Sequence, residues 1–291
     1  MPTPANALSR REMLAATAAA LAAVAAGGRQ SAVARVTAGR LKQSVSRWPY
    51  STIPLPEFAR AAASMGLQAI DLLQPDEWTV VRDQGLTCSM GYPTARRDFI
   101  ATGFNDPANH PMLLRELERT IPLAARAGVP NVIAMFGNRR GEPDATAIAH
   151  CVHGLSRIKR LAEEQGVTVC VELLNSKVDH KGYQGDRTAF GVEVVRAVDS
   201  PRVKLLYDIY HMQIMEGDVI RTVRDNIRHI AHFHTGGVPG RHELDDSQEL
   251  NYRAVARAIA DLGFTGYVAH EFVPTKEPLA SLREAVAICT V

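Results

Sequence analysis

Eight short apolar runs, separated by segments with a helical pattern, constrain the fold of this chain more than any other feature. The runs are Leu41–Ser46, Ala69–Leu73, Thr87–Tyr92, Asn131–Phe136, Thr168–Leu174, Val203–Ile209, Ile230–Thr235 and Tyr267–Phe272. Most of them are continuously apolar rather than alternating, which is typical of strands that are covered on both faces of a parallel sheet. The pattern therefore predicts an α/β protein built from repeated strand–helix units.

Four of the intervening helical segments end in the same way. Leu55–Gly66, Met112–Gly128, Ala145–Gly166 and Leu250–Gly263 each finish on a glycine shortly before the next strand. Repeated use of one helix-to-strand loop favours a closed barrel. The rival fold, an open doubly wound sheet, would want a glycine-rich turn after the first strand, but the chain continues there as SRWPYSTIP. We predict a single-domain (β/α)₈ barrel, the TIM barrel.

The first 34 residues have the layout of a twin-arginine export signal. Arg10 and Arg11 precede an Ala- and Leu-rich run that is too short to span a bilayer, and Ala32-Val33-Ala34 offers a cleavage site. We expect residues 1–34 to direct the protein to the periplasm and residues 35–291 to form the barrel. A frayed N-terminal helix or an uncleaved anchor are the alternatives for this segment.

Charge and cysteine content limit the classes of function. The leader contains three arginines and one glutamate, which leaves 30 of the 33 basic and 30 of the 31 acidic residues in the body. A neutral body gives no support for nucleic-acid binding, or for membrane binding after cleavage of the signal. The four cysteines are far apart and contain no CxxC pair, so we expect buried thiols rather than disulfides. They are Cys88, Cys151, Cys170 and Cys289.

Four consecutive strand units carry a polar residue at or near the end of the apolar run. These residues are Glu172, Asp208, His234 and Glu271, and successive positions lie 36, 26 and 37 residues apart. Each interval fits one strand, one helix and their loops, and parallel βα units bring the carboxyl ends of their strands to one mouth. Three carboxylates and an imidazole are suitable ligands for a divalent cation such as Mg²⁺, Mn²⁺ or Co²⁺. The spacing therefore predicts a metal site at this mouth.

Further polar residues follow these strand ends and are candidates for substrate binding, because loops at this end of a barrel hold substrate groups. They are Asn175, Lys177, His180, His211 and Arg241. Arg241 could grip a carboxylate or form an ordinary salt bridge, and both interpretations stay open. Trp48 and Trp78 could each wall the pocket or pack in the core or at its rim. The remaining histidines with no assigned role are expected at the surface, namely His110, His150, His153 and His229.

Two stretches of the chain resemble hydroxypyruvate isomerases of the xylose-isomerase-like barrel superfamily. They are KLLYDIYHMQIMEGD and the segment from NIRHIAHFHTGG through PGRHE and ELNY to YVAHEFVP. The resemblance implies that Glu172, Asp208, His234 and Glu271 bind the metal and that Glu172 and Glu271 are the acid/base pair. It also implies that His211 and Arg241 contact the substrate. Many members of that family have Gln where this chain has His234, whereas ketose 3-epimerases have His.

The implied activity is the interconversion of hydroxypyruvate and 2-hydroxy-3-oxopropanoate through a metal-stabilised enediolate. His234 keeps open a ketose 3-epimerase or a sugar or inosose dehydratase on the same barrel. A related class, the endonuclease IV type, needs more histidine ligands and a basic groove, which the neutral body does not favour. An exported carbohydrate-binding barrel is the non-enzyme alternative. The expected partner is a small hydroxy-carbonyl acid or sugar, and barrels of this superfamily are often homo-oligomers.

Overall fold

Eight parallel strands close into a barrel in the order of the chain, with β8 paired to β1. The computed structural model describes residues 39–291. The strands are β1 (Lys42–Ser46), β2 (Ala69–Leu73), β3 (Thr87–Gly91), β4 (Asn131–Met135), β5 (Thr168–Leu173), β6 (Val203–Asp208), β7 (Ile230–Thr235) and β8 (Tyr267–His270). All eight lie within the runs expected from the sequence, and the predicted (β/α)₈ barrel is confirmed.

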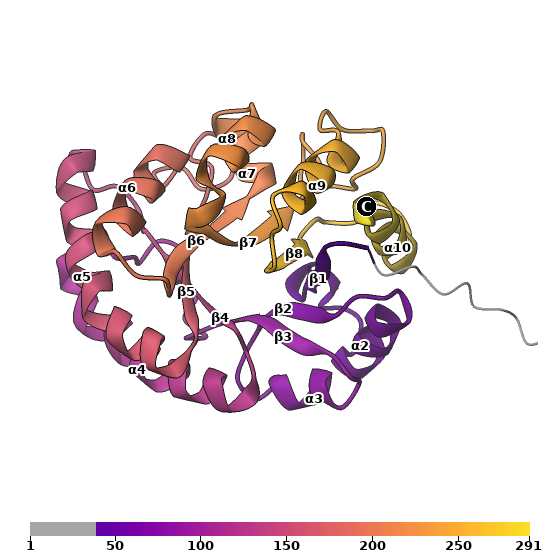
Figure 1. The fold of residues 1–291 in the computed structure, drawn as a ribbon, viewed down its shortest axis with the longest axis horizontal. Helices are drawn as coiled ribbons and strands as arrows, with labels where there is room; N and C mark the ends of the chain where they lie inside the picture. The colour runs from indigo at the N-terminus through magenta and orange to yellow at the C-terminus, as the bar shows by residue number, and fades with distance from the viewer. Residues whose placement is uncertain (1–38) are drawn as a thin grey trace, which may run out of the picture. The chain divides into compact units, whose positions relative to one another are not determined.

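Helices lie around the outside of the strands, and the colour sequence in Figure 1 follows the chain once around the barrel. They are α2 (Leu55–Ser64), α3 (Trp78–Arg82), α4 (His110–Ala127), α5 (Asp144–Gln165), α6 (Thr188–Val198), α7 (Ile209–Met215), α8 (Val219–Asn226), α9 (Tyr252–Asp261) and α10 (Pro278–Cys289). Three short 3₁₀ helices, η1 (Trp48–Tyr50), η2 (Pro107–Asn109) and η3 (Ile227–His229), complete the described elements. None of the helices in residues 39–291 is long and apolar enough to cross a membrane.

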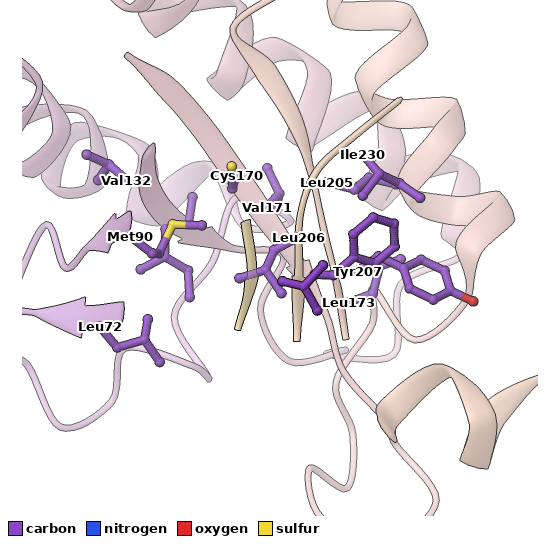
Figure 2. Packing of buried hydrophobic residues seen from close by; sticks show 14 of the residues in the cluster. Leu72, Met90, Val132, Cys170, Val171, Leu173, Leu205, Leu206, Tyr207 and Ile230 are labelled. Carbon is purple, nitrogen blue, oxygen red and sulfur yellow. The ribbon is translucent and has the colours of Figure 1, made fainter. Parts of the chain in front are cut away.

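The strands are buried on both faces, as their continuous apolar sequences require. In β6, Leu205, Leu206 and Tyr207 are all fully buried, and the Tyr207 ring packs edge-on against Phe233 of β7. Figure 2 shows these side chains from β6 with those of the neighbouring strands β5 and β7. Burying a large apolar side chain contributes about 1.5–3 kcal/mol, so this interior is the main source of the barrel's stability.

The glycines at the helix ends have the backbone conformation that their position predicted. Gly128 and Gly166 end α4 and α5 with φ of 73° and 68°, in the left-handed region. Gly66 and Gly263 follow α2 and α9 with φ of 87° and 69°. A side chain with a Cβ is strained in this region, which explains why four connections use the same residue.

Five strands end one or two residues earlier than expected, and the differences in β6 and β8 matter for the site. The run Val203–Ile209 stops at Asp208 because the Asp208 carboxylate accepts a hydrogen bond from the Tyr210 amide at 2.9 Å and begins α7. The run Tyr267–Phe272 stops at His270, so Glu271 lies just beyond β8. Both carboxylates are thereby at the carboxyl ends of their strands.

The structure also bears on the expectations for the cysteines and for His110. All four cysteines are buried and unpaired, which confirms the prediction of thiols. The expectation of a surface position for His110 is wrong, because its ring is 2 % exposed and Nε2 lies 2.9 Å from the Phe104 carbonyl oxygen. The signal segment expected at residues 1–34 lies outside the described residues.

Candidate metal centre and substrate cavity

The four polar residues expected at the metal site converge at the carboxyl ends of β5 to β8. One ligand atom from each of Glu172, Asp208, His234 and Glu271 lies within 4.8 Å of the other three. All four side chains are buried. Asp208 and His234 are register partners on β6 and β7, so neighbouring strands place them side by side. The sequence spacing therefore identified a group that the barrel brings together.

The orientation of His234 fits a cation at the centre of this group. Its Nε2 lies 3.1 Å from Oδ2 of Asp71, and its Nδ1 lies 2.5 Å from Oε2 of Glu271 and 3.5 Å from Oε1 of Glu172. Nδ1 nevertheless has no partner in hydrogen-bonding geometry. When Nε2 carries the proton, Nδ1 presents a lone pair towards carboxylate oxygens, and a divalent cation among these acceptors would satisfy all of them.

The two glutamates have different surroundings. Burial and the nearby Glu271 charge raise the pKa of Glu172 to about 7, although His234 opposes the shift. Burial would also raise the pKa of Glu271, but His234, Arg241 and Trp48 outweigh it and lower the pKa to about 2. Before a cation binds, one carboxyl group therefore holds its proton much more readily than the other.

Arg241 lies directly against the site carboxylates. Its Nη2 donates to Oδ2 of Asp208 at 2.7 Å and to Oε2 of Glu271 at 2.5 Å. The guanidinium also lies 5.1 Å from the ring centre of Tyr210 and 5.7 Å from that of Trp48. These contacts fix the Arg241 guanidinium beside two aromatic rings. Its positive charge offsets part of the negative charge of the carboxylates.

A cavity of about 610 Å³ opens above this group. Of the residues expected to contact substrate, His180, His211 and Arg241 line it. Asn175 lies behind them, and its amide nitrogen is 2.7 Å from Nδ1 of His211. Asn175 therefore supports a wall residue rather than forming the wall.

Lys177 does not line the cavity. Its ammonium group donates to the carbonyl oxygens of Ile214 and Met215 at 2.9 and 3.1 Å, at the end of α7. The lysine therefore satisfies the last carbonyls of a helix, which is a common role for a basic residue near a helix C-terminus.

One of the two tryptophans considered as pocket walls lines the cavity, and sequence reasoning did not identify several other lining residues. Trp48 lines it, and its Nε1 donates to Oε1 of Glu271 at 2.5 Å, whereas Trp78 is buried in the core. The loop after β3 contributes a second wall, formed by Tyr92, Thr94, Ala95, Arg96, Arg97, Phe99 and Ile100. The one available signal was position, because both segments follow the carboxyl end of a strand.

Comparison with known proteins agrees with this geometry. The profile of the xylose isomerase-like TIM barrel family matches residues 32–289. The chain belongs to this family. Within it, the chain is 31 % identical over 236 residues to a 2-oxo-tetronate isomerase of Cupriavidus necator, covering 81 % of this chain and 83 % of that protein.

A second similar relative is a putative hydroxypyruvate isomerase of Homo sapiens, 26 % identical over 245 residues, with 79 % of this chain and 88 % of that protein covered. Among solved structures, a family 2 AP endonuclease from Brucella melitensis superposes with a TM-score of 0.74 at 23 % identity. That match covers 83 % of this chain and 97 % of that chain, and it supports the fold of this xylose isomerase-like barrel.

Proposed function

We propose that this protein is a sugar-acid isomerase that interconverts hydroxypyruvate and 2-hydroxy-3-oxopropanoate. The observation that carries the proposal is the pair of glutamates, Glu172 and Glu271, which flank His234 in one buried group beneath a cavity and differ in pKa. The names of the similar isomerases, which act on small sugar acids, support the same class of substrate.

The reaction requires a proton to move between adjacent carbons. One glutamate takes the proton from C3 of hydroxypyruvate, which leaves an enediolate, and a glutamate returns a proton at C2, while the hydroxyl proton passes from O3 to O2. Glu172, Asp208, His234 and Glu271 would hold a divalent cation, which would supply Lewis-acid stabilisation of the enediolate. Glu172 and Glu271 belong to the same buried group, so one can remove the proton and the other can return it.

Neighbouring side chains orient Glu271. Trp48 donates to Oε1 of Glu271, and Arg241 donates to Oε2 at 2.5 Å each. Both oxygens are therefore fixed before substrate enters, which reduces the reorganisation needed for proton transfer. His180 and His211 both line the cavity, and His180 is suited to bind substrate oxygens. Both ring nitrogens of His211 already contact Asn175 and Arg241.

The size of the cavity supports a second candidate. A volume of about 610 Å³ is large for a three-carbon acid and lies in the range of pockets that hold larger ligands. A four-carbon 2-oxo acid, or a ketose undergoing 3-epimerisation, could occupy the same site with its reacting carbons beside the glutamates.

Product analysis separates these possibilities. The purified protein, loaded in turn with Mg²⁺, Mn²⁺ and Co²⁺, is incubated with hydroxypyruvate, with a 2-oxo-tetronate and with a panel of ketoses. We expect 2-hydroxy-3-oxopropanoate from hydroxypyruvate. If the protein converted the four-carbon acid or a ketose but not hydroxypyruvate, the three-carbon assignment would be wrong. Sugar binding without turnover of any compound would favour the carbohydrate-binding alternative.

A further inference from the structure

A second polar cluster lies beside the metal centre. Of its residues, only His234 was predicted from the sequence to belong to the site. It consists of Asp71 of β2, His232 and His234 of β7, Ser44 of β1 and Ser89 of β3. Each of these side chains is 0 % exposed. A carboxylate at this depth is costly unless all its oxygens are hydrogen-bonded, so Asp71 needs an explanation.

The hydrogen bonds of Asp71 divide between its two oxygens. Oδ1 accepts from the hydroxyl groups of Ser44, at 2.9 Å, and of Ser89. Oδ2 lies 2.5 Å from Nε2 of His232 and 3.1 Å from Nε2 of His234. The serines therefore hold one oxygen while the other faces both imidazoles.

Direct hydrogen bonds account for both oxygens of Asp71. The Oδ2 oxygen is within hydrogen-bonding distance of both Nε2 atoms, so hydrogen bonds can join Asp71 to both rings. An ionised carboxylate accepts hydrogen bonds only, so the imidazole nitrogens that face it must carry protons.

We propose that Asp71 is a positioning residue for His234, an inference that rests on the proposed metal centre. By accepting the Nε2 proton of His234, Asp71 keeps the lone pair on Nδ1, the atom that faces Glu172 and Glu271. It also fixes the rotation of the ring. A carboxylate behind a histidine ligand raises its basicity, and loss of such a partner typically weakens metal binding by about 10- to 100-fold.

His232 makes the arrangement more rigid. Its Nε2 shares Oδ2 with His234, and the two rings lie edge to face with centres 5.2 Å apart. The two residues are separated by one position on β7, so both side chains point to the same side of the strand. His232 thus helps to hold the carboxylate of Asp71 in place.

The test measures Mn²⁺ affinity by titration calorimetry at pH 7 in the full-length protein, without substrate. We expect Asp71→Ala to weaken binding about 100-fold and Asp71→Asn about tenfold, because the amide keeps an acceptor but loses the charge. Ser89→Ala is the matched control, since it removes a donor to the other oxygen of the same carboxylate. It should change Mn²⁺ affinity less than threefold.

A second readout separates positioning from general loss of structure. The visible absorption spectrum of bound Co²⁺ reports the ligand geometry, and we expect it to change in Asp71→Asn but not in Ser89→Ala. Circular dichroism of the metal-free variants checks folding, and Asp71→Asn keeps the shape of the side chain if Asp71→Ala fails to fold.

Two results would overturn the proposal. One is wild-type Mn²⁺ affinity and an unchanged Co²⁺ spectrum in Asp71→Asn, and the other is an equal loss of affinity in Ser89→Ala. A wild-type protein that binds no divalent cation would overturn the metal centre itself. Because no substrate is used, a protein that binds Mn²⁺ normally but does not isomerise hydroxypyruvate refutes the proposed function and leaves the role of Asp71 intact.

Discussion

Glu271 has the most constrained side chain at the centre of the site. Its two carboxylate oxygens meet Trp48, Arg241 and Nδ1 of His234, each at 2.5 Å. Glu172 is as deeply buried but has weaker compensation, with Nδ1 of His234 at 3.5 Å. The difference in donors, not in depth, therefore separates the pKa values of the two carboxyl groups before a cation binds.

Replacing Glu271 with glutamine tests the more acidic member of the pair. We expect Glu271→Gln to lower kcat for hydroxypyruvate by at least about 10²–10⁴-fold, because the amide cannot accept a proton. The shape of the side chain is kept, so the barrel should still fold, as measured by circular dichroism. Near-wild-type steady-state rates in a folded variant would refute the catalytic role.

The pKa of Glu172 predicts how stability depends on pH in the metal-free protein. In the folded protein, Glu172 keeps its proton up to about pH 7. In the unfolded chain, the same group loses it near the ordinary glutamate pKa of 4.5. This stabilisation is complete below pH 4.5 and is lost as the pH rises through about 7, with a total effect on the order of 3 kcal/mol.

Urea unfolding at pH 5, 6, 7 and 8 in the presence of a chelator measures this effect. We expect the free energy of unfolding to fall across the series in the wild type. The fall should be smaller in Glu172→Gln, which cannot release a proton. An equally steep fall in this variant would assign the pH dependence to other groups, such as His234, whose pKa is also raised by the surrounding carboxylates in spite of its burial.

At the scale of elements, the strand–helix connections on the two ends of the barrel have different tasks. The connections that lead into strands are short and turn at glycines such as Gly128 and Gly166. The connections that follow strands contain residues of the site. The segments after β1 and β3, for example, line the cavity. Stability and function are therefore assigned to opposite ends of the same elements.

Gly128 offers a clean test of the stabilising end. No atom lies within 4 Å of a Cβ placed there, so the cost of Gly128→Ala comes from its φ of 73° alone. We expect a loss of about 1–2 kcal/mol in the free energy of unfolding, measured by urea titration. Gly128→Asn should lose less, since asparagine tolerates this region better. Equal losses would mean that backbone conformation is not the cause.

For the whole molecule, the metal centre links four consecutive strands from β5 to β8 through buried side chains. A cation that binds only the folded state stabilises it by mass action, by about 2.7 kcal/mol at 100 times Kd. We expect chelation to lower Tm by about 5–10 °C relative to the Mn²⁺-saturated protein, measured by calorimetry. Glu172→Gln provides the control and should show a smaller difference. An unchanged Tm after complete metal removal would argue against a tight site.

We also propose that the protein acts in the periplasm after export by the twin-arginine route, which the pairing of Arg10 and Arg11 before an apolar run supports. We expect the exported protein to begin near Arg35, as measured by mass spectrometry of the periplasmic fraction. Changing both arginines to lysine should retain the full-length chain in the cytoplasm. Export that is insensitive to this change would contradict the route.

The sequence alone determined the strands, the glycine turns and the four residues that converge at the metal centre. Each of these depends on local chemistry: apolar runs, a positive φ that favours glycine, and polar groups at strand ends. Lys177 shows the limit of such reasoning, because its neighbours in the chain suggested the cavity while its ammonium group contacts the end of α7.

Only the tertiary structure decided which side chains distant in sequence meet inside the barrel. Asp71 lies 163 positions from His234, and its apolar strand gave no indication of which residue it would contact. Trp48 lies 223 positions from Glu271, beyond the end of another strand. Barrel closure sets these contacts, because β1 and β2 complete the circle next to β8, and the sequence of one strand contains no record of what faces it across the interior.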